Sequence, residues 1–403
     1  MIIERLETFR CHLPSRRELR TGARTSTGEE RLILALVTDD GSEGWGEATA
    51  IPVWGGLHGR YFGETVSTVE HIVHDLLAPV LFNADLMSLD PLMDRFDSVI
   101  RGHVYAKGAL EIALQDLRGK ALGVPISTLL GGRYRDNVRI AHMIAFMANE
   151  EALAEAERAV EADGITAFQI KGGIDPNRDE RLVAMLRDRL GPSVFLRLDA
   201  NQGYGDNPKT AAGIVMRLEH AGLDAIEQPG ASNLALKACR DAVGIPVIAD
   251  ESCWQDHDVL ELGRSGACDA ISVYIAKAGG IGRAKRVAQL AERFGLPCDL
   301  NGSLESGIGT AASIQTALAV KSATLPSVTS IPSLRENPLT EIAGRYWQDD
   351  LVVEGLSYEA GHLSLGTSPG LGVVVDRARL EGMTPSAPRV SARARASGRI
   401  ITG

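Results

Sequence analysis

The chain has 403 residues, of which 44% are hydrophobic and 23% charged, and its formal net charge is −10. This composition is typical of a globular protein, and the length accommodates a barrel of about 250 residues plus further elements. The acidic balance argues against nucleic acid and anionic membranes as partners, and no run approaches the roughly 18 apolar residues of a membrane helix.

The N-terminal segment indicates a protein that stays in the cytoplasm. MIIERLETFRCHLPSRR is charged almost from its start and lacks the apolar core of a signal peptide. Five cysteines are scattered without the spacing of zinc or redox sites: Cys11, Cys239, Cys253, Cys268 and Cys298. We therefore expect free thiols in a reducing cytoplasm.

Residues 1–130 have the pattern of an α+β capping domain. Residues 32–37 alternate loosely as a strand, 39–42 form a turn, and 44–47 begin a return strand. Helical periodicity follows from 64 to 77, ending before Ala78-Pro79, and again from 106 to 122, ending before Gly123-Val124-Pro125. Strands followed by segregated helices are typical of this class.

A stretch rich in glycine and aromatic residues lies between these strands and helices. It contains Trp54, His58 and Tyr61. We expect these side chains to form a lid, because loops of a capping domain commonly set substrate choice.

From about 131 to 350 strands alternate with helices. Amphipathic helices are expected at 150–162, 178–190 and 281–294, and no Gly-x-Gly-x-x-Gly turn suggests a dinucleotide site. Alternation with short loops indicates parallel βα units, and about eight strands favour a closed barrel over an open sheet. The candidate strands are 138–146, 166–172, 193–199, 223–228, 246–251, 269–275, 296–301 and 325–332.

The C-terminal part differs from the barrel pattern. Residues 351–385 include Gly370-Leu371-Gly372-Val373, which resembles the start of a strand and whose expected place is against the capping domain. Residues 386–403 are rich in small residues, with several arginines and no acid, so we expect a disordered tail.

Three acidic residues each end a short apolar run. They are Asp199, Glu227 and Asp250, and their intervals approach the roughly 30 residues of one βα unit. One such acid alone is more simply a helix N-cap, but three in successive repeats favour a metal site at the mouth of the barrel. Oxygen ligands of this kind suit Mg²⁺, with Mn²⁺ as the alternative ion.

Lys171 ends the preceding apolar run, one repeat before Asp199. A nearby divalent cation disfavours the ammonium form, so the pKa of Lys171 is expected to fall towards neutrality. A lysine of this kind serves as a general base. The alternative from position alone is a solvated loop charge.

In this order the residues resemble the enolase superfamily, and most closely its muconate-lactonizing-enzyme-like subgroup (the mandelate racemase/muconate lactonizing enzyme family). The resemblance runs from about residue 2 to 376. Its motifs are Gly44-Trp45-Gly46-Glu47, Lys171, D-A-N-Q-G from Asp199, E-Q-P from Glu227, D-E-S from Asp250, K-A-G-G-I from Lys277 and L-E-S-G-I-G from Leu304.

The resemblance implies an α/β fold, a modified (β/α)7β TIM-type barrel. An α+β capping domain would be formed by the N-terminal region (1–130) and the C-terminal segment (351–385), with the catalytic barrel at 131–350. The implied chemistry is abstraction of the proton α to a carboxylate, with Mg²⁺ holding that carboxylate. Such barrels often assemble, so a homo-oligomer is expected.

The resemblance also implies roles for individual residues. Lys171, Tyr274 and Lys277 are the catalytic candidates, and Glu251 lies beside the metal ligands Asp199, Glu227 and Asp250. The candidates for contact with the substrate are Gln169, Asn201, Glu305, Trp54 and Tyr61.

The sequence departs from the family pattern on two strands. Gln169 replaces the first lysine of the usual Lys-x-Lys, and Tyr274 stands where the subgroup usually has a lysine on the sixth strand. Tyr274 is then a proton donor in a one-base reaction, an acid/base partner activated by Lys277, or barrel wall. Lys277 itself is more often structural, pairing with Asp250 or Glu251. No histidine ends the seventh strand, so a His/Asp dyad is not expected.

These observations lead to one main hypothesis and two alternatives. The main hypothesis is a Mg²⁺-dependent isomerase or lyase that acts on a small carboxylate with Lys171 as its base, by dehydration or cycloisomerisation. The first alternative is a racemase or epimerase of an amino-acid or hydroxy-acid derivative that opposes Lys171 and Tyr274. The second is a catalytically inactive metal-binding scaffold.

Overall fold

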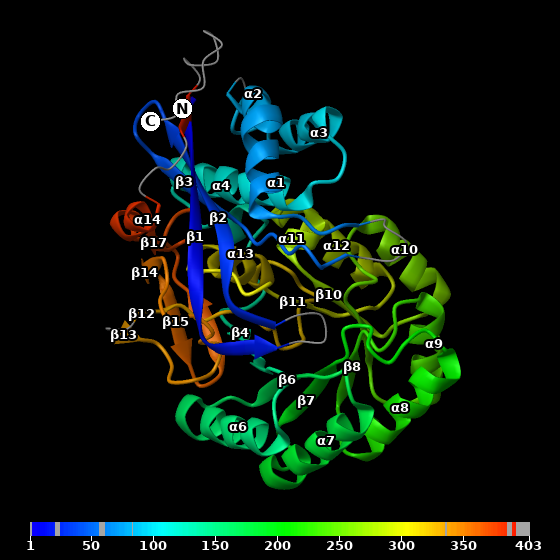
Figure 1. Cartoon of the computed structure of the whole chain (residues 1–403). Helices are drawn as coiled ribbons and strands as arrows, with labels where there is room; N and C mark the ends of the chain where they lie inside the picture. The colour runs from blue at the N-terminus through cyan, green and yellow to red at the C-terminus, as the bar shows by residue number, and fades with distance from the viewer. Residues whose placement is uncertain are drawn as a thin grey trace.

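The computed structural model describes residues 2–20, 25–55, 61–82, 84–334, 337–384 and 389–391, and His58 of the expected lid lies outside this set. An antiparallel sheet with helices occupies one end of the molecule and a parallel barrel the other (Figure 1). All five cysteines are free and buried. No helix among the described residues is both long and apolar enough to cross a membrane.

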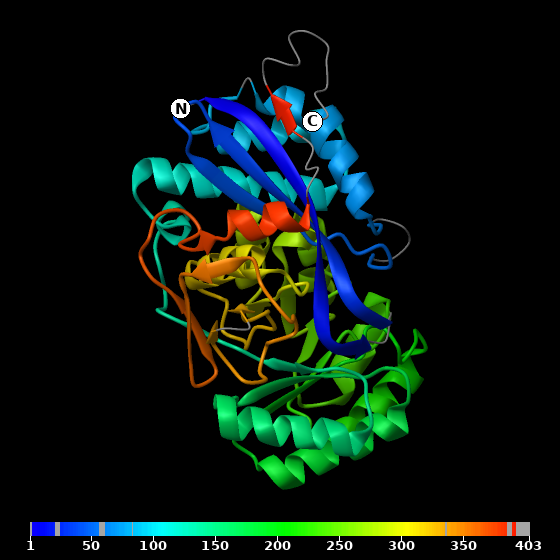
Figure 2. The same cartoon turned by 60° about the vertical axis from the view of Figure 1, so that its left-hand side comes forward.

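The first sheet is built from the long strands β1 (Ile3–Arg20) and β2 (Thr25–Thr38), followed by β3 (Glu43–Ala48). Its strand order is β18-β1-β2-β3, with antiparallel pairing throughout. The expected hairpin between 32–37 and 44–47 is therefore present. Figure 2 shows that the far end of the β1–β2 hairpin leaves the cap and reaches the barrel.

Helices cover one face of this sheet. They are α1 (Val66–His71), the π-helix η2 (Ile72–Leu77), α2 (Ala78–Leu81), α3 (Leu89–Val99) and α4 (Val104–Leu122). The helix expected to stop before Ala78-Pro79 continues into α2, because Pro79 lies in the first turn of α2, where a missing N–H costs little. α4 packs closely on β3: a Cβ on Gly46 would lie 2.0 Å from the carbonyl oxygen of Ala109.

Seven parallel strands form the barrel sheet, in the order β11-β10-β9-β8-β7-β6-β5. Neighbours in sequence are neighbours in the sheet, as successive βα units require. The strands are β5 (His142–Ile144), β6 (Ala167–Lys171), β7 (Phe195–Asp199), β8 (Ala225–Glu227), β9 (Val247–Ala249), β10 (Ala270–Val273) and β11 (Cys298–Leu300).

The helices between these strands surround the barrel (Figure 1). Several begin at a residue whose side chain accepts a backbone N–H; Asn207 and Ser232 are examples. The barrel helices are α6 (Asn149–Asp163), α7 (Pro176–Leu190), α8 (Pro208–His220), α9 (Asn233–Ala242), α10 (Asp256–Ser265), the short α11 (Ile275–Ala278), α12 (Ile281–Arg293) and α13 (Gly307–Leu318).

The segment 325–332 does not form the eighth regular strand that was expected. It contains Pro326 and Pro332, which cannot donate ladder hydrogen bonds. Ser327 nevertheless bridges Ile140 in parallel, and the Leu325 amide donates to the carbonyl of Cys298 at 3.1 Å. The segment therefore lies between β11 and the start of the first barrel strand, and closes a (β/α)7β barrel.

The C-terminal part returns towards the cap. α14 (Arg377–Met383) packs on β1, and Arg377 pairs with Glu7 and Glu43 (Figure 2). The remaining elements are α5 (Ile126–Leu129), β4 (Val138–Arg139), β12 (Ser333–Leu334), β13 (Asn337–Pro338), β14 (Val352–Glu354), β15 (Leu356–Glu359), β16 (His362–Leu365), β17 (Val374–Val375) and β18 (Arg389–Ser391).

Residues 370–373 lead directly into the short strand β17, as a strand entry should, and Gly370 forms an isolated bridge with Pro125. The Leu371 amide donates to the buried carboxylate of Asp116 on α4 at 2.8 Å, which places the segment against the cap. One expectation for this part needs correction. Within the tail expected to be disordered, 389–391 forms β18, which pairs with the edge of β1. An uncovered edge offers unpaired N–H and C=O groups to any nearby segment.

A buried acid near the junction of cap and barrel makes stability depend on pH. Asp350 is 1% exposed, and its Oδ1 accepts from the amides of Gly307, Leu351 and Val352. Burial raises the pKa of Asp350 to about 7. Because this pKa lies above the unfolded value, the stabilisation is complete at low pH and is lost as pH rises through 7.

We expect Asp350→Asn to remove this contribution. The asparagine keeps Oδ1 as the acceptor but does not titrate. Unfolding free energy measured from pH 4 to 8 should therefore fall with pH in the original chain and fall less in the variant, by up to about 1.4 kcal/mol per pH unit. Parallel pH profiles for the two proteins would contradict the assignment.

Candidate active site

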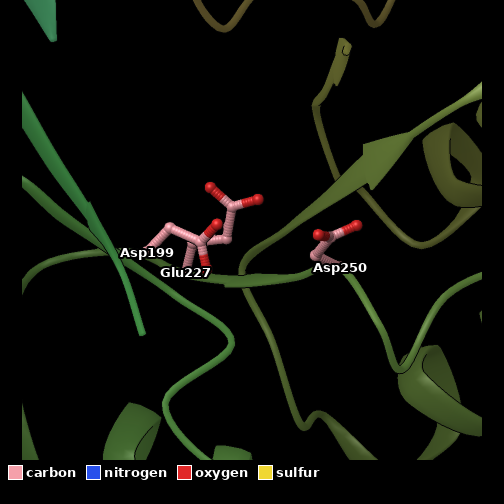
Figure 3. Close-up of side chains that lie close together, drawn as sticks. All are labelled: Asp199, Glu227 and Asp250. Carbon is pink, nitrogen blue, oxygen red and sulfur yellow. The ribbon is translucent and has the colours of Figure 1, made fainter. Parts of the chain in front are cut away.

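The barrel register aligns the candidate residues at one end of the sheet. Lys171, Asp199 and Glu227 are direct neighbours across β6, β7 and β8, and each is the last residue of its strand. Asp250 follows the end of β9. Figure 3 shows the three carboxylates grouped at the ends of adjacent strands. Carboxyl ends of parallel strands meet at the mouth of a barrel, where active sites form.

The three acids form a compact, buried group. Asp199, Glu227 and Asp250 each offer one oxygen, and these oxygens lie within 4.8 Å of one another. None of the three is more than 2% exposed. Burial raises the pKa of Glu227 well above its usual value, and the charges of Asp199 and Asp250 raise it further against the pull of Arg197.

This arrangement fits a divalent cation. Like charges held together without water are costly unless a positive charge compensates them. Among the described residues, Oε1 of Glu227 has no hydrogen-bond partner although it is buried. A hard cation with oxygen ligands would satisfy this oxygen and the group as a whole.

Lys171 lies beside this group. Its Nζ is 2.5 Å from Oδ2 of Asp199. Burial alone would lower the pKa of Lys171, but the carboxylates of Asp199 and Glu227 outweigh that effect and raise it. The expected fall of this pKa therefore depends on a cation that cancels the field of the carboxylates.

Gln169 and Arg197 hold Glu227 in place. The Gln169 amide donates to Oε2 of Glu227 at 2.8 Å, and Nε of Arg197 lies 3.2 Å from the same oxygen. Arg197 is buried and also pairs with Asp299. Sequence reasoning missed Arg197, although its place two residues before Asp199 puts both side chains on one face of β7.

Hydrogen bonds from Lys277 hold Asp250 in place. Its Nζ donates to Oδ1 of Asp250 at 2.5 Å, to the Asp250 carbonyl at 2.8 Å and to the Ser272 carbonyl at 2.8 Å. All three ammonium hydrogens are used, and Lys277 does not line the pocket. This geometry supports the structural role that family resemblance favours for Lys277.

Tyr274 lines the pocket at the end of β10. Its ring meets Trp54 edge to face at 5.0 Å, and Nδ2 of Asn301 lies 3.4 Å from its hydroxyl. Burial raises the pKa of Tyr274 well above its usual value, and the charges of Asp250 and Glu227 add to the effect. The phenol is therefore neutral at physiological pH and suited to donate a hydrogen bond rather than to accept a proton.

Asn201 and Glu251 lie together beside the three acids. Nδ2 of Asn201 donates to Oε1 of Glu251 at 3.1 Å, and the Asn201 amide donates to Oδ1 of Asp199 at 2.9 Å. Burial and the charge of Asp250 raise the pKa of Glu251 to about 8. Asn201 also lines the pocket, so it links the pocket to the three acids.

The pocket above the acids has a volume of about 690 Å³. Gln169, Lys171, Asn201, Asp250 and Tyr274 provide its polar wall. This pattern of a few polar groups in an apolar cleft is typical of small-molecule sites. The apolar wall, most of which sequence reasoning missed, consists of Ile51, Val53, Trp54, Met143, Leu304 and Val328.

Two of the expected substrate contacts, Tyr61 and Glu305, do not line this pocket. Tyr61 stacks on Trp254 with ring centroids 4.6 Å apart, and its hydroxyl donates to Asp258 at 2.6 Å. Trp254 in turn contacts Trp54. Tyr61 therefore supports the aromatic wall instead of forming its surface.

Glu305, the other such residue, lies beneath a loop that does form the pocket wall. Its Oε1 accepts from the Ser303 amide at 2.7 Å, and burial raises its pKa to about 7. From the opposite side, the buried Arg31 of β2 donates to the carbonyls of Ser303 at 3.2 Å and Leu304 at 2.9 Å. The cap thus holds this part of the pocket, a contact that no sequence pattern indicates.

Comparison with known families agrees with this geometry. Residues 151–379 match the family model described as Enolase C-terminal domain-like. Residues 6–131 match the N-terminal domain of mandelate racemase / muconate lactonizing enzyme. The chain belongs to the enolase superfamily.

Its relatives place this superfamily member in the muconate-lactonizing-enzyme-like subgroup. It is 32% identical over 374 residues to muconate cycloisomerase 1 of Rhodococcus opacus, covering 91% of this chain and 94% of the relative. It is 30% identical over 379 residues to L-Ala-D/L-Glu epimerase of Bacillus subtilis, covering 93% and 97%. The chain is an enzyme of the isomerase and lyase group of this superfamily.

A solved structure shares the complete fold of the superfamily. The dipeptide epimerase from Cytophaga hutchinsonii, complexed with Mg and the dipeptide D-Ala-L-Val, superposes with a TM-score of 0.84 at 25% sequence identity. The match covers 97% of this chain and 99% of that structure. The fold expected from the sequence, a (β/α)7β barrel with an α+β cap, is therefore confirmed.

Proposed function

We propose that the protein is a Mg²⁺-dependent enzyme that removes the proton α to the carboxylate of a small substrate. Lys171 is the base, and a one-base dehydration or cycloisomerisation is the favoured outcome. The observation that carries the proposal is Lys171 beside the buried triad: among the described residues that line the pocket, it is the one amine. Mn²⁺ is the alternative ion.

The residues divide the work as follows. Asp199, Glu227 and Asp250 would hold the cation, which supplies the positive charge that binds the substrate carboxylate and stabilises the enolate. In a dehydration, Lys171 removes the α-proton and gives it to the β-hydroxyl on the same face, which leaves as water when its C–O bond breaks. In a cycloisomerisation, a carboxylate oxygen of the substrate adds to its conjugated double bond, and the ammonium of Lys171 protonates the α-carbon. The apolar wall excludes water, which strengthens these charge interactions.

Two other residues keep the ligands in register during the reaction. Gln169 orients Glu227 through its amide, and Lys277 fixes Asp250 through two hydrogen bonds and donates a third to the Ser272 carbonyl. Preorganisation of this kind avoids reorganisation when charge develops on the substrate.

A second candidate function is a racemase or epimerase that uses both Lys171 and Tyr274. β10 is separated from β6 by three strands in the sheet order, so Tyr274 lies across the barrel mouth from Lys171. The B. subtilis relative is an epimerase. The neutral phenol favours the one-base reaction, because a racemase needs a proton acceptor on each face.

Tyr274→Phe separates these two candidates. We expect the variant to keep α-proton exchange within about tenfold of the original, because the hydroxyl makes only a long contact with Asn301 and its ring packing is preserved. Exchange is followed by proton NMR in D₂O. Loss of racemisation by 100-fold or more, with exchange on the Lys171 face retained and folding unchanged, would instead assign Tyr274 as the acid of a two-base enzyme.

The reaction class is tested with the Mg²⁺-loaded protein and a panel of carboxylates in D₂O. Acid sugars, hydroxyproline-like amino acids, N-acyl amino acids and unsaturated diacids form the panel. Deuterium incorporation on one stereochemical face, or product formation by elimination or cyclisation, supports the proposal. Racemisation with deuterium uptake from both enantiomers would support the epimerase, and no exchange with bound Mg²⁺ would support an inactive scaffold.

We also propose how the chain is organised and where it acts. Residues 1–130 would form the cap, 131–350 the catalytic barrel, and 351–385 the segment that returns to the cap; apart from β18, the expected tail 386–403 lies outside the described residues. The buried free cysteines support a reducing cytoplasm. A homo-oligomer is the proposed assembly, as is common for such barrels.

A further inference from the structure

A second cavity, of about 580 Å³, lies outside the barrel wall. The end of the β1–β2 hairpin forms one side, α6 another, and the loop 342–346 a third. In Figure 2 the hairpin is seen reaching the barrel in this region. Its lining includes Arg16, Arg17, Arg158, Arg345, His142 and Glu155.

The lining carries a strong excess of positive charge. Four arginines face one carboxylate, that of Glu155, in a chain whose formal net charge is −10. Burial lowers the pKa of Arg17, and the nearby charges of Arg16 and Arg158 lower it further, whereas Tyr346 and Glu151 oppose this. Like charges gathered in this way repel one another unless an anion lies between them.

The one carboxylate that lines the cavity, that of Glu155, already has two partners. Glu155 pairs with Arg17, with Nη2 of Arg17 2.6 Å from Oε1, and the same oxygen accepts from Nε2 of His142 at 2.7 Å. The other ring nitrogen, Nδ1, accepts from the Gly344 amide at 3.0 Å, so His142 is a neutral imidazole with its proton on Nε2. Burial and the charge of Arg17 lower the pKa of His142 to about 3. Glu155 thus compensates the charge of Arg17, and the charges of the other three arginines are left without a carboxylate from the cavity lining.

Arg345 has capacity for a ligand. Among the described residues, its Nε is buried without a hydrogen-bond partner. Burial lowers the pKa of Arg345, and the charge of Arg16 lowers it further, whereas Asp349 opposes this. Asp349 pairs with Arg379. A planar guanidinium with an unused N–H is the usual partner of a carboxylate or phosphate oxygen.

Hydrogen bonds hold the guanidinium of Arg16 at the edge of the cavity. Its Nη1 donates to the carbonyls of Glu341 at 3.0 Å and Arg345 at 3.5 Å. The hairpin and the loop 342–346 are thereby joined at the edge of the cavity. Arg158, exposed on α6, completes a positively charged wall on three sides.

We propose that this cavity binds a compact polyvalent oxyanion, of the phosphate or phosphate-monoester class, between Arg16, Arg158 and Arg345. Tetrahedral oxygens match several guanidinium groups that converge from different elements. The wall between this site and the catalytic pocket is β5: His142 faces the cavity, and Met143 faces the pocket. The Met143 amide also donates to the hydroxyl of Tyr346, which lines the cavity.

The test measures binding of inorganic phosphate to the full-length, Mg²⁺-loaded protein at constant ionic strength, with chloride as the balancing salt. Titration calorimetry is expected to show one saturable site per chain. Thermal unfolding at 10 mM phosphate should shift upward by at least about 2 °C. Arg345→Gln and Arg158→Gln should each weaken binding by at least about tenfold.

Arg264→Gln on α10 is the matched control. Arg264 is exposed, and α10 follows β9, which three strands separate from β5, the strand that precedes α6. It should bind phosphate as the original protein does. Sulfate and succinate distinguish tetrahedral anions from dicarboxylates. Absence of saturable binding up to 20 mM, equal binding by all variants, or tighter binding of succinate than of phosphate would each overturn the assignment.

Discussion

Lys171→Ala is expected to abolish α-proton exchange while leaving Mg²⁺ binding in place. Loss of a general base costs about 10² to 10⁴ in rate. The three proposed ligands are untouched by this substitution, and removal of the ammonium that pairs with Asp199 frees that carboxylate for the cation. Exchange is measured by NMR in D₂O with the carboxylate identified in the panel, and Mg²⁺ affinity by calorimetry.

Lys237→Ala is the matched control for this variant. Lys237 is partly exposed on α9, and among the described residues it pairs with Asp241, one helical turn away. Its loss should leave both exchange and Mg²⁺ affinity unchanged. If Lys171→Ala retained exchange with normal Mg²⁺ affinity, the base would have to be another residue and the proposed chemistry would fail.

Removal of the metal is expected to destabilise the protein as well as to stop the reaction. A ligand that binds only the folded state stabilises it by about 2.7 kcal/mol at a concentration 100 times its Kd. The buried triad has no equivalent in an unfolded chain. Chelation should therefore lower the unfolding temperature by several degrees, and added Mg²⁺ should restore it.

Glu227→Gln tests whether Mg²⁺ stabilises the protein by binding to the triad. Burial and the neighbouring acids already favour the neutral form of Glu227 without a cation, so the variant should match the chelated original protein in unfolding temperature. It should gain no stability from Mg²⁺, because a neutral amide is a weaker ligand. The exposed Asp241→Asn serves as control. Equal stabilisation of Glu227→Gln by Mg²⁺ would show that the ion binds elsewhere.

The grouping that sequence reasoning predicted correctly is governed by local periodicity. Lys171, Asp199 and Glu227 each end a strand, and one βα repeat separates neighbours, so parallel pairing alone brings them together. Their grouping needs no knowledge of side-chain packing. The helices α6, α7 and α12 follow the expected ranges within a few residues for the same reason.

The features that sequence reasoning missed depend on contacts between distant segments. Arg31 reaches Ser303 and Leu304 from the cap, and no local pattern links strands so far apart in the chain. Glu305 was expected at the substrate but turns towards the Ser303 amide. The segment 325–332 closes the barrel through isolated bridges that its prolines allow, so a strand was expected where regular pairing is incomplete.

The structure narrows the roles that the sequence leaves open for Tyr274. The sequence leaves three roles for this residue, and its burial beside Asp250 and Glu227 favours a neutral phenol. The position of Tyr274 in the pocket wall, against Trp54, also allows it to shape the substrate space. The proton donor and the wall are thus the two roles that the geometry supports best.

The central claim is that Asp199, Glu227 and Asp250 hold one cation whose presence turns Lys171 towards the substrate. A crystal structure with Mg²⁺ and a bound carboxylate tests it most directly. We predict one ion ligated by all three acids and by the substrate carboxylate, with Nζ of Lys171 within about 3.5 Å of the α-carbon. An ion bound elsewhere, or a Lys171 that stays paired with Asp199 and away from the α-carbon, would contradict the account.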